Sequence, residues 1–253
     1  MSTDFQKDLL KVSIFDSRAE MGKAAGRQAA EIIKNTIQKK GTANVMFAAA
    51  PSQNETLAEL CKADIDWTKV NAFHMDEYIH LDENHPAGFR LFLKRAIFDR
   101  FPFKTVNLLD GNAPDPEREA ERYSALLDAY PLDVCLLGIG ENGHIAFNDP
   151  PVADFHDEKE VKIVELEQRC RQQQVNDKCF DTIEQVPTHA LTVTIPVLMS
   201  AGTLICSVPA KTKADAVKHL LQDEISTACP ATIMCTHPDA HLYLDPDSAS
   251  LIN

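Results

Sequence analysis

Residues 132–151, LDVCLLGIGENGHIAFNDPP, carry the clearest fold signal in this chain. The apolar run Val134–Leu137 does not alternate with polar residues, which is typical of a strand covered on both faces in the centre of a parallel sheet. Gly138, Gly140 and Gly143 follow it and let the backbone turn sharply and approach a ligand. Because ligands of open parallel sheets bind beyond the carboxyl ends of the strands, we expect the chemistry here.

The same glycines have the GxGxxG spacing of a dinucleotide-binding turn. No helix-forming run follows them directly, however, and Asp149, Pro150 and Pro151 would end one soon afterwards. The spacing alone is weak evidence, so we do not expect a dinucleotide site, and no other cofactor is predicted.

On both sides of this stretch the sequence alternates between strand and helix patterns. Apolar runs predict strands at 12–15, 44–50, 190–195, 203–208, 232–235 and 241–244, another ending near Phe73, and an extended piece at 106–109. Apolar residues at helical spacing predict helices at 17–40, 53–61, 87–98, 116–129, 196–200 and 211–221. This order predicts a doubly wound three-layer α/β sandwich with a mostly parallel central sheet.

Helix ends and one irregular segment add detail to this prediction. Asp16 or Ser17 is expected to cap the first helix, Gly41 to end it, and Ser52 with Glu55 to form a capping box for the second. The alternation degrades between about 150 and 187, where residues 167–174 are polar throughout. We expect a mobile flap at 151–187 and a single domain spanning 1–253.

Composition narrows the class of protein. The formal net charge of -13, without basic runs, argues against nucleic-acid and anionic-membrane partners, so an anionic substrate would need a local basic site. Seven scattered cysteines without a CxxC pair predict reduced thiols, with neither a disulfide framework nor a zinc site. No apolar run approaches bilayer length and the polar start is unlike a signal peptide, so a cytoplasmic location is predicted.

Two groups of residues could perform acid–base chemistry. Asp76 and Glu77 follow a predicted strand end, where a dry environment would raise the pKa of a general base; their alternative role is to solvate a loop. His144 with Asp149 offers a histidine oriented by a carboxylate, as proton shuttling requires, although His144 could equally cap a helix from a turn. We expect both groups at the same sheet edge.

Cations at helix starts are the candidates for binding an anion. Lys213 follows a predicted strand and begins a helix, where a cation is unfavourable unless an anion accompanies it. Residues 52–54 (Ser52, Gln53 and Asn54) begin another helix and could cradle an anion in the same way. Arg169, Arg171 and Lys178 in the flap could reach such a group, although surface lysines and arginines are usually only solvated. Three histidines are expected to be structural, because none has metal-ligand spacing: His189, His237 and His241.

Three motifs stand out along the chain, namely FHMDEYIHLDENHPAGFR at 73–90, LLGIGENGHIAFNDP at 136–150 and VPTHALTV at 186–193. Together and in this order they resemble the glucosamine-6-phosphate deaminase/isomerase family. The resemblance implies isomerisation of an amino-sugar phosphate with loss of ammonia, giving fructose 6-phosphate from glucosamine 6-phosphate without a metal or organic cofactor. It implies that Asp76 is the base between C2 and C1, that His144 opens the ring with Asp149 as its partner, and that Lys213 binds phosphate.

The sequence departs from this family at three places. The glycine- and threonine-rich phosphate loop is replaced by AAAPSQN at 48–54, and Asn142 stands where some deaminases have aspartate, so it can orient the histidine ring without supplying charge. The phosphate arginine of the flap has no certain match; Lys178 is nearest by spacing, with Arg169 and Arg171 as rivals.

Four functions therefore stay open at this point. Glucosamine-6-phosphate deaminase is favoured by MDEY and by HIAFN after Gly143. The alternatives are a deaminase for galactosamine 6-phosphate, a 6-phosphogluconolactonase, and a non-catalytic sugar-phosphate sensing domain, although the last would need a basic DNA-binding segment that is not evident. The expected partner is a small-molecule sugar phosphate, and a homo-oligomer is left open.

Overall fold

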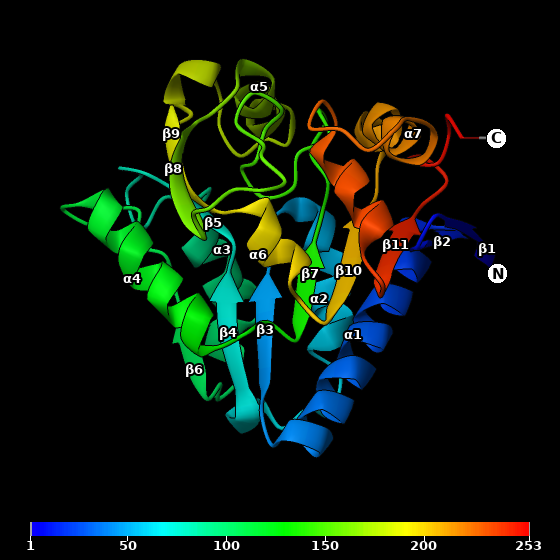
Figure 1. Cartoon of the computed structure of the whole chain (residues 1–253), viewed down its shortest axis with the longest axis horizontal. Coiled ribbons are helices and arrows are strands. Elements are labelled where there is room, and N and C mark those ends of the chain that lie inside the picture. Colours follow the sequence, from blue (N-terminus) through cyan, green and yellow to red (C-terminus); the bar gives the residue numbers. More distant parts are fainter. Residues whose placement is uncertain (1, 253) are drawn as a thin grey trace.

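A computed structural model describes residues 2–252, with a central sheet of eight strands (Figure 1). All neighbouring strands are parallel except the first two, which form an antiparallel hairpin that the polar start of the sequence did not predict. The predicted doubly wound α/β fold is confirmed. The strand order is β1 (Ser2–Lys7), β2 (Leu10–Phe15), β11 (Ala240–Leu244), β10 (Thr203–Val208), β7 (Val134–Leu137), β3 (Ala43–Phe47), β4 (Val70–His74) and β6 (Thr105–Asn107).

The strand order reverses between β3 and β7. From β3 the chain proceeds outward through β4 to β6, then returns to place β7 on the other side of β3, followed by β10 and β11. The two strands pair in parallel through Val45 with Val134, Met46 with Cys135 and Phe47 with Leu136. A reversal of this kind leaves a crevice at the carboxyl ends of the two strands, which is where α/β sheets bind ligands.

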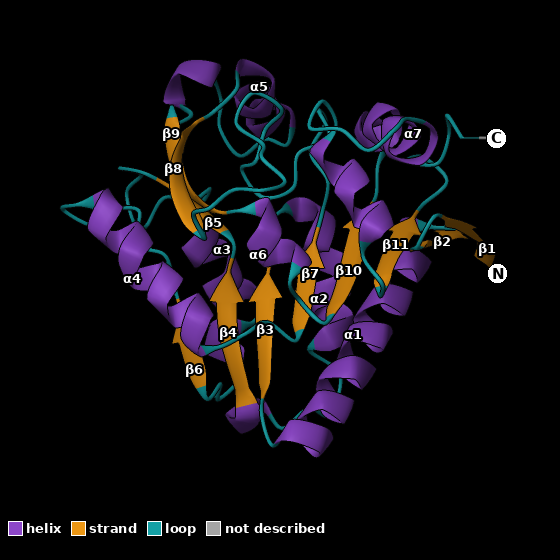
Figure 2. Cartoon of the chain, in the orientation of Figure 1, coloured by secondary structure: helices purple, strands orange, loops and turns teal. Residues whose placement is uncertain are grey.

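Helices cover both faces of the sheet (Figure 2). Alternate residues of β3 show the division, because Val45 and Phe47 pack in one apolar cluster and Met46 in the other. The first cluster includes residues of α1 (Arg18–Lys40), α2 (Asn54–Leu60) and α3 (Phe89–Ala96). The second includes residues of α4 (Pro116–Ala129), α6 (Ile195–Met199) and α7 (Ala214–Gln222). A parallel sheet buried on both faces requires such continuous apolar strands, as the sequence indicated.

The predicted ends of α1 are confirmed. The side chain of Ser17 accepts a hydrogen bond from the Glu20 amide at 3.2 Å, and Gly41 has a φ of 82° at the carboxyl end. A serine cap contributes about 1 kcal/mol to helix stability because it satisfies an amide that would otherwise lack a partner. These local signals fix where the long helix begins and ends beside the sheet.

A second, smaller sheet lies over the carboxyl ends of the central strands (Figure 1). It contains β5 (Asp76–Tyr78), β9 (His189–Val193) and β8 (Val161–Glu165), which pair antiparallel in that order. The helix α5 (Gln168–Asn176) lies beside it, within the segment predicted as a flap. The strand predicted at 190–195 is confirmed as β9, which pairs with β5 and β8 and not with the central sheet.

Two sequence predictions are wrong. Residues 232–235 lie in the 3₁₀ helix Pro230–Thr236, since a short buried apolar run cannot be assigned by periodicity and Pro230 favours a helix start. Ser52 and Glu55 form no capping box, because Ser52 lies in the 3₁₀ turn Pro51–Gln53 and α2 has no side-chain cap. The other 3₁₀ turns are Trp67–Lys69, Phe98–Arg100, Ile183–Gln185 and Lys211–Lys213. Among residues 2–252, no helix has both the length and the apolar character needed to span a membrane.

Candidate active site

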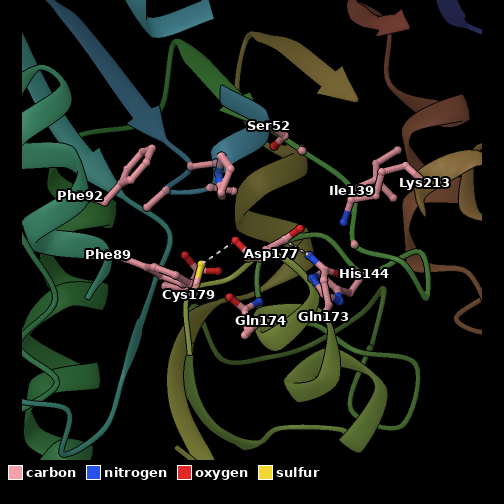
Figure 3. Close-up of a pocket in the computed structure, with 18 of the residues that line it drawn as sticks. Ser52, Phe89, Phe92, Ile139, His144, Gln173, Gln174, Asp177, Cys179 and Lys213 are labelled. Carbon is pink, nitrogen blue, oxygen red and sulfur yellow. Dashed lines mark hydrogen bonds between the residues drawn. The ribbon is translucent and has the colours of Figure 1, made fainter. Parts of the chain in front are cut away.

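A cavity lies at the carboxyl ends of the central strands, between the loop that contains Ser52 and residues 173–179 of segment 151–187 (Figure 3). Its walls come from the loops after β3, β4, β7 and β10, so it includes the crevice expected where the strand order reverses. Segment 151–187 lines the side opposite Ser52 with polar side chains and one thiol, namely Gln173, Gln174, Asp177 and Cys179. The sequence predicted the edge of the sheet correctly but none of these four lining residues.

The glycine-rich turn after β7 places His144 in the cavity wall. A Cβ atom at Gly140 would overlap the imidazole ring of His144, so this position accepts no larger residue without moving the ring. Gly143 has a φ of 84°, a left-handed conformation that glycine adopts readily. The predicted sharp turn is thus confirmed, and it holds the histidine close against its own backbone.

Asn142 and Asp149 hold the imidazole of His144 from one side. The Nδ1 atom of His144 lies 2.7 Å from Asn142 Oδ1 and 2.8 Å from Asp149 Oδ1. Asn142 Nδ2 donates to Asp149 Oδ1 at 2.9 Å and also to Glu167 in the flap. Three predicted site residues therefore form one network, and Glu167 is a fourth member that the sequence did not indicate. No hydrogen bond reaches the Nε2 atom of His144 from the described residues 2–252.

Asp149 is suited to remain ionised in this network. Burial alone would raise its pKa, but the positive charge that His144 can carry, and hydrogen bonds from His144, Asn142 and the Glu167 amide, hold the pKa of Asp149 below its usual range. An ionised carboxylate fixes the orientation of an imidazole and stabilises its protonated form. Asp149 therefore has the properties of a carboxylate that orients His144.

Asp76 and Glu77 have different environments although they are adjacent. Glu77 accepts hydrogen bonds from the amides of Phe89 and Arg90 at 3.2 and 2.8 Å, so it caps the start of α3. Asp76 lines the cavity with only 7% of its surface exposed, and no hydrogen bond or ion pair reaches its carboxyl group within residues 2–252. Both carboxylates are buried, so the alternative in which they solvate a loop is wrong.

The environment of Asp76 favours its protonated form. Burial, followed by the negative charges of Glu77 and Asp149, raises the pKa of Asp76 well above its usual range. A carboxylate without hydrogen bonds and with a raised pKa accepts a proton more readily than a solvated one. Asp76 therefore has the properties of a general base facing the cavity that His144 also faces.

Lys213 is the buried cation of the cavity. Its side chain is only 6% exposed, and its ammonium group has no hydrogen bond or ion pair in the described part of the chain. Burial lowers its pKa, and the negative charges of Asp177 and Glu141 oppose that change. A buried ammonium without a direct partner is costly unless an anion joins it, so the geometry agrees with the predicted anion site.

The loop after β3 contributes Ser52 to the cavity but uses Gln53 as a structural clamp. Ser52 lines the cavity, and its hydroxyl accepts a hydrogen bond from Gln53 Nε2 at 3.1 Å. The same Nε2 atom lies 3.1 Å from the Leu137 carbonyl and 3.3 Å from that of Ser207, which ties the loop to the ends of β7 and β10. Asn54 begins α2 and does not line the cavity.

The three flap cations predicted as phosphate ligands do not line the cavity. Arg169 donates to the carbonyl of Glu141 at 3.0 Å, and Arg171 donates to the carbonyls of Ile183 and Val186 at 2.6 and 2.9 Å. Lys178 is exposed with a φ of 60°. The arginine that does line the cavity is Arg18, at the start of α1, and no motif in the sequence pointed to it.

One group of side chains has the composition of a metal site. His144, Asp149 and Cys170 each place one potential ligand atom within 4.8 Å of the others. The sequence predicted no zinc site, and it could not show that the flap brings a cysteine to this histidine. Burial raises the pKa of the Cys170 thiol well above its usual range, which disfavours the thiolate that metals prefer. The hydrogen bonds to His144 therefore favour a network that orients its imidazole over a metal site.

Comparison with known proteins places this geometry in a family. Residues 16–243 match the family described as glucosamine-6-phosphate isomerases/6-phosphogluconolactonase. The chain belongs to this family. A glucosamine-6-phosphate deaminase of Bacillus cytotoxicus is 36% identical over 242 residues, covering 96% of this chain and 89% of the relative. One of Exiguobacterium is 37% identical over 233 residues, covering 92% of this chain and 89% of the relative.

Solved structures of the family agree with the fold. A monomeric glucosamine-6-phosphate deaminase superposes with a TM-score of 0.86 at 29% identity, covering 95% of this chain and 99% of the other. The 6-phosphogluconolactonase of Trypanosoma brucei superposes with a TM-score of 0.77 at 17% identity, covering 99% of this chain and 100% of the other. The second likeness concerns the fold alone, whereas the two relatives at 36% and 37% identity are named as deaminases.

Proposed function

We propose that the protein converts glucosamine 6-phosphate and water to fructose 6-phosphate and ammonia. The observation that carries this proposal is the pairing, in one cavity, of the unpartnered Asp76 carboxyl group with the oriented His144 imidazole. Removing a proton next to a carbonyl needs a base against one face of an open-chain sugar, and opening the ring needs a separate acid–base group. The names of the relatives at 36% and 37% identity support the same reaction.

His144 carries out the ring opening in this proposal. Its Nδ1 atom is engaged by Asn142 and Asp149, so Nε2 is the atom that exchanges a proton with the ring oxygen and the C1 hydroxyl. The C1 hydroxyl loses its proton, the C1–O5 bond breaks, and the ring oxygen receives a proton. The ionised Asp149 stabilises the imidazolium formed on the way.

Asp76 then moves a proton along the open chain. Its carboxylate removes the proton from C2 while the substrate's ammonium group gives a proton to O1, which forms an enolamine; Asp76 then returns its proton to C1, which leaves an iminium at C2. Water adds to C2 and ammonia leaves as the ketone forms. The raised pKa of Asp76 suits both halves of this step, because the same group must take the proton and give it back.

Lys213 binds the phosphate of the substrate in this proposal. A buried ammonium without a direct partner is matched by a phosphate dianion, and the sugar chain can then extend from Lys213 toward His144 within the same cavity (Figure 3). Ser52 supplies a hydroxyl to the same cavity. This arrangement fixes one end of the substrate while the acid–base groups act on the other.

We also propose that segment 151–187 acts as a flap, because its residues Gln173, Gln174 and Asp177 line the cavity. Amide hydrogen exchange in this segment is expected to slow when inorganic phosphate or fructose 6-phosphate binds, and equal exchange would reject the role. A cytoplasmic location accords with the cysteines, all free within the described chain, and the sequence remains one domain in this proposal.

Ammonia release from a panel of 2-amino-sugar 6-phosphates tests the proposed reaction. Release with glucosamine 6-phosphate, together with fructose 6-phosphate, is expected. Release from the galacto epimer alone would keep the mechanism and change the substrate. Hydrolysis of 6-phosphogluconolactone without ammonia from any amino sugar would instead identify a lactonase, and binding without turnover would identify a sensing domain.

A further inference from the structure

The phosphate end of the cavity has fewer cations than the sequence suggested. A phosphate monoester carries close to two negative charges at neutral pH, and Lys213 supplies one positive charge. Arg169 donates to the carbonyl of Glu141, Arg171 donates to two carbonyls within segment 151–187, and Lys178 is exposed outside the cavity lining. A second cation must therefore come from another element if the proposed function is correct.

Arg18 is the other cation that lines the cavity within residues 2–252. It is the first residue of α1, and its guanidinium donates to the carbonyl of Pro51 at 2.7 Å, directly before Ser52. Ser52 and Lys213 line the same cavity. The loop after β3 therefore joins the arginine to the serine, in the place where the family's glycine- and threonine-rich loop is replaced.

The guanidinium of Arg18 is held in place but not fully used. Glu55 accepts from Arg18 Nε at 2.8 Å, and Pro51 accepts from Nη2, whereas Nη1 has no partner in residues 2–252. The Arg18 side chain is 37% exposed, so an anion entering from solvent can reach it. Fixing one edge of a planar guanidinium directs its remaining donors, which favours bidentate recognition of a phosphate.

We infer that Arg18 binds the substrate phosphate together with Lys213 and the Ser52 hydroxyl, replacing a flap cation with an arginine from α1. Glu55 is a positioning residue, because it orients the guanidinium without reaching the substrate. This inference rests on the proposed function for the identity of the substrate. The site itself is a phosphate subsite formed by α1 and the loops after β3 and β10.

The experiment compares Arg18→Ala with Arg27→Ala. The Arg27→Ala variant is the control, because it removes a similar ion pair between α1 and α2. Arg27 also lies on α1 and donates from Nε to Glu59 of α2 at 3.0 Å, but it does not line the cavity. We expect Arg18→Ala to raise KM for glucosamine 6-phosphate by about 10- to 100-fold with kcat changed much less. The KM of Arg18→Lys should be intermediate, since lysine keeps the positive charge but lacks the planar guanidinium that can donate two parallel hydrogen bonds.

Binding of inorganic phosphate, measured by calorimetry, separates this inference from the proposed reaction. Arg18→Ala should weaken phosphate binding by about tenfold or more, whereas Arg27→Ala should leave it unchanged. Equal phosphate affinity and equal KM in the two variants would overturn the role of Arg18, even if the wild type releases ammonia. A wild type that binds phosphate through Arg18 without releasing ammonia would instead reject the proposed function.

Discussion

The two ends of the cavity differ in how many of the residues predicted from the family motifs they contain. At the proposed acid–base end, Asp76 and His144 line the cavity and Asp149 contacts His144, while Asn142 is hydrogen-bonded to His144 and to Asp149 but not to Asp76. At the phosphate end only Lys213 and Ser52 of the predicted residues line the cavity. The reacting atoms allow little change in geometry, whereas an anion can be bound by any suitably placed cations.

Substituting Asp76 or His144 tests the end that follows the family and should have the largest effect. Asp76→Asn or His144→Gln should lower kcat by at least about 10²- to 10⁴-fold, because each removes one proton-transfer group. Ammonia release at saturating substrate measures this. A loss below tenfold in both folded variants would show that the acid–base chemistry lies elsewhere.

The raised pKa of Asp76 also predicts a pH-dependent change in stability. Because its carboxyl holds a proton more tightly in the folded protein, ionisation destabilises the fold as pH rises from its unfolded pKa, near 4, through its folded pKa. Asp76→Asn should therefore unfold at higher denaturant than the wild type at pH 8, and this advantage should disappear toward pH 4. An opposite trend would contradict the assigned environment.

Substituting Lys213 tests the phosphate end and should have the next largest effect. Lys213→Ala should raise KM about 10- to 100-fold, since it removes a charged partner of the phosphate. Lys211→Ala is the matched control, because Lys211 is exposed in the same turn and does not line the cavity. Equal KM values in the two variants would show that the phosphate binds elsewhere.

Asn142 allows a smaller test of how the acid–base end is held together. Asn142→Asp removes the amide that donates to Asp149 and Glu167 and adds a third carboxylate. We expect it to lower the free energy of unfolding by about 1–3 kcal/mol at pH 7. The loss should diminish as pH falls, since protonation relieves the repulsion. Chemical denaturation at two pH values measures it, and unchanged stability would show that the network contributes little.

The smallest expected effect concerns the backbone beside Lys213. Ala210 has a φ of 83° and a ψ of 148°, a conformation that is nearly restricted to glycine and costs about 1–3 kcal/mol in other residues. Ala210→Gly should therefore raise the free energy of unfolding by about 1 kcal/mol after glycine's own entropic cost. A lower melting temperature for Ala210→Gly would show that the methyl group of Ala210 stabilises the fold by more than the backbone strain destabilises it.

Features that depend on residues close together in the chain could be predicted from the sequence, whereas features that depend on distant residues could not. The strand at Val134–Leu137, the Ser17 cap and the glycine turn depend on adjacent residues, and all three were predicted. The pairing of β9 with β8 depends on residues far apart in the chain, which a period of apolar residues cannot specify. For the same reason Arg18, which reaches the cavity from another helix, carried no recognisable motif.

The most direct test of the central claim is the stoichiometry of products from glucosamine 6-phosphate, measured for the wild type and for Asp76→Asn. The wild type should release ammonia and fructose 6-phosphate in equal amounts, and Asp76→Asn should release neither at a comparable rate. A folded wild type that yields no ammonia, or an Asp76→Asn variant that matches it, would contradict the account.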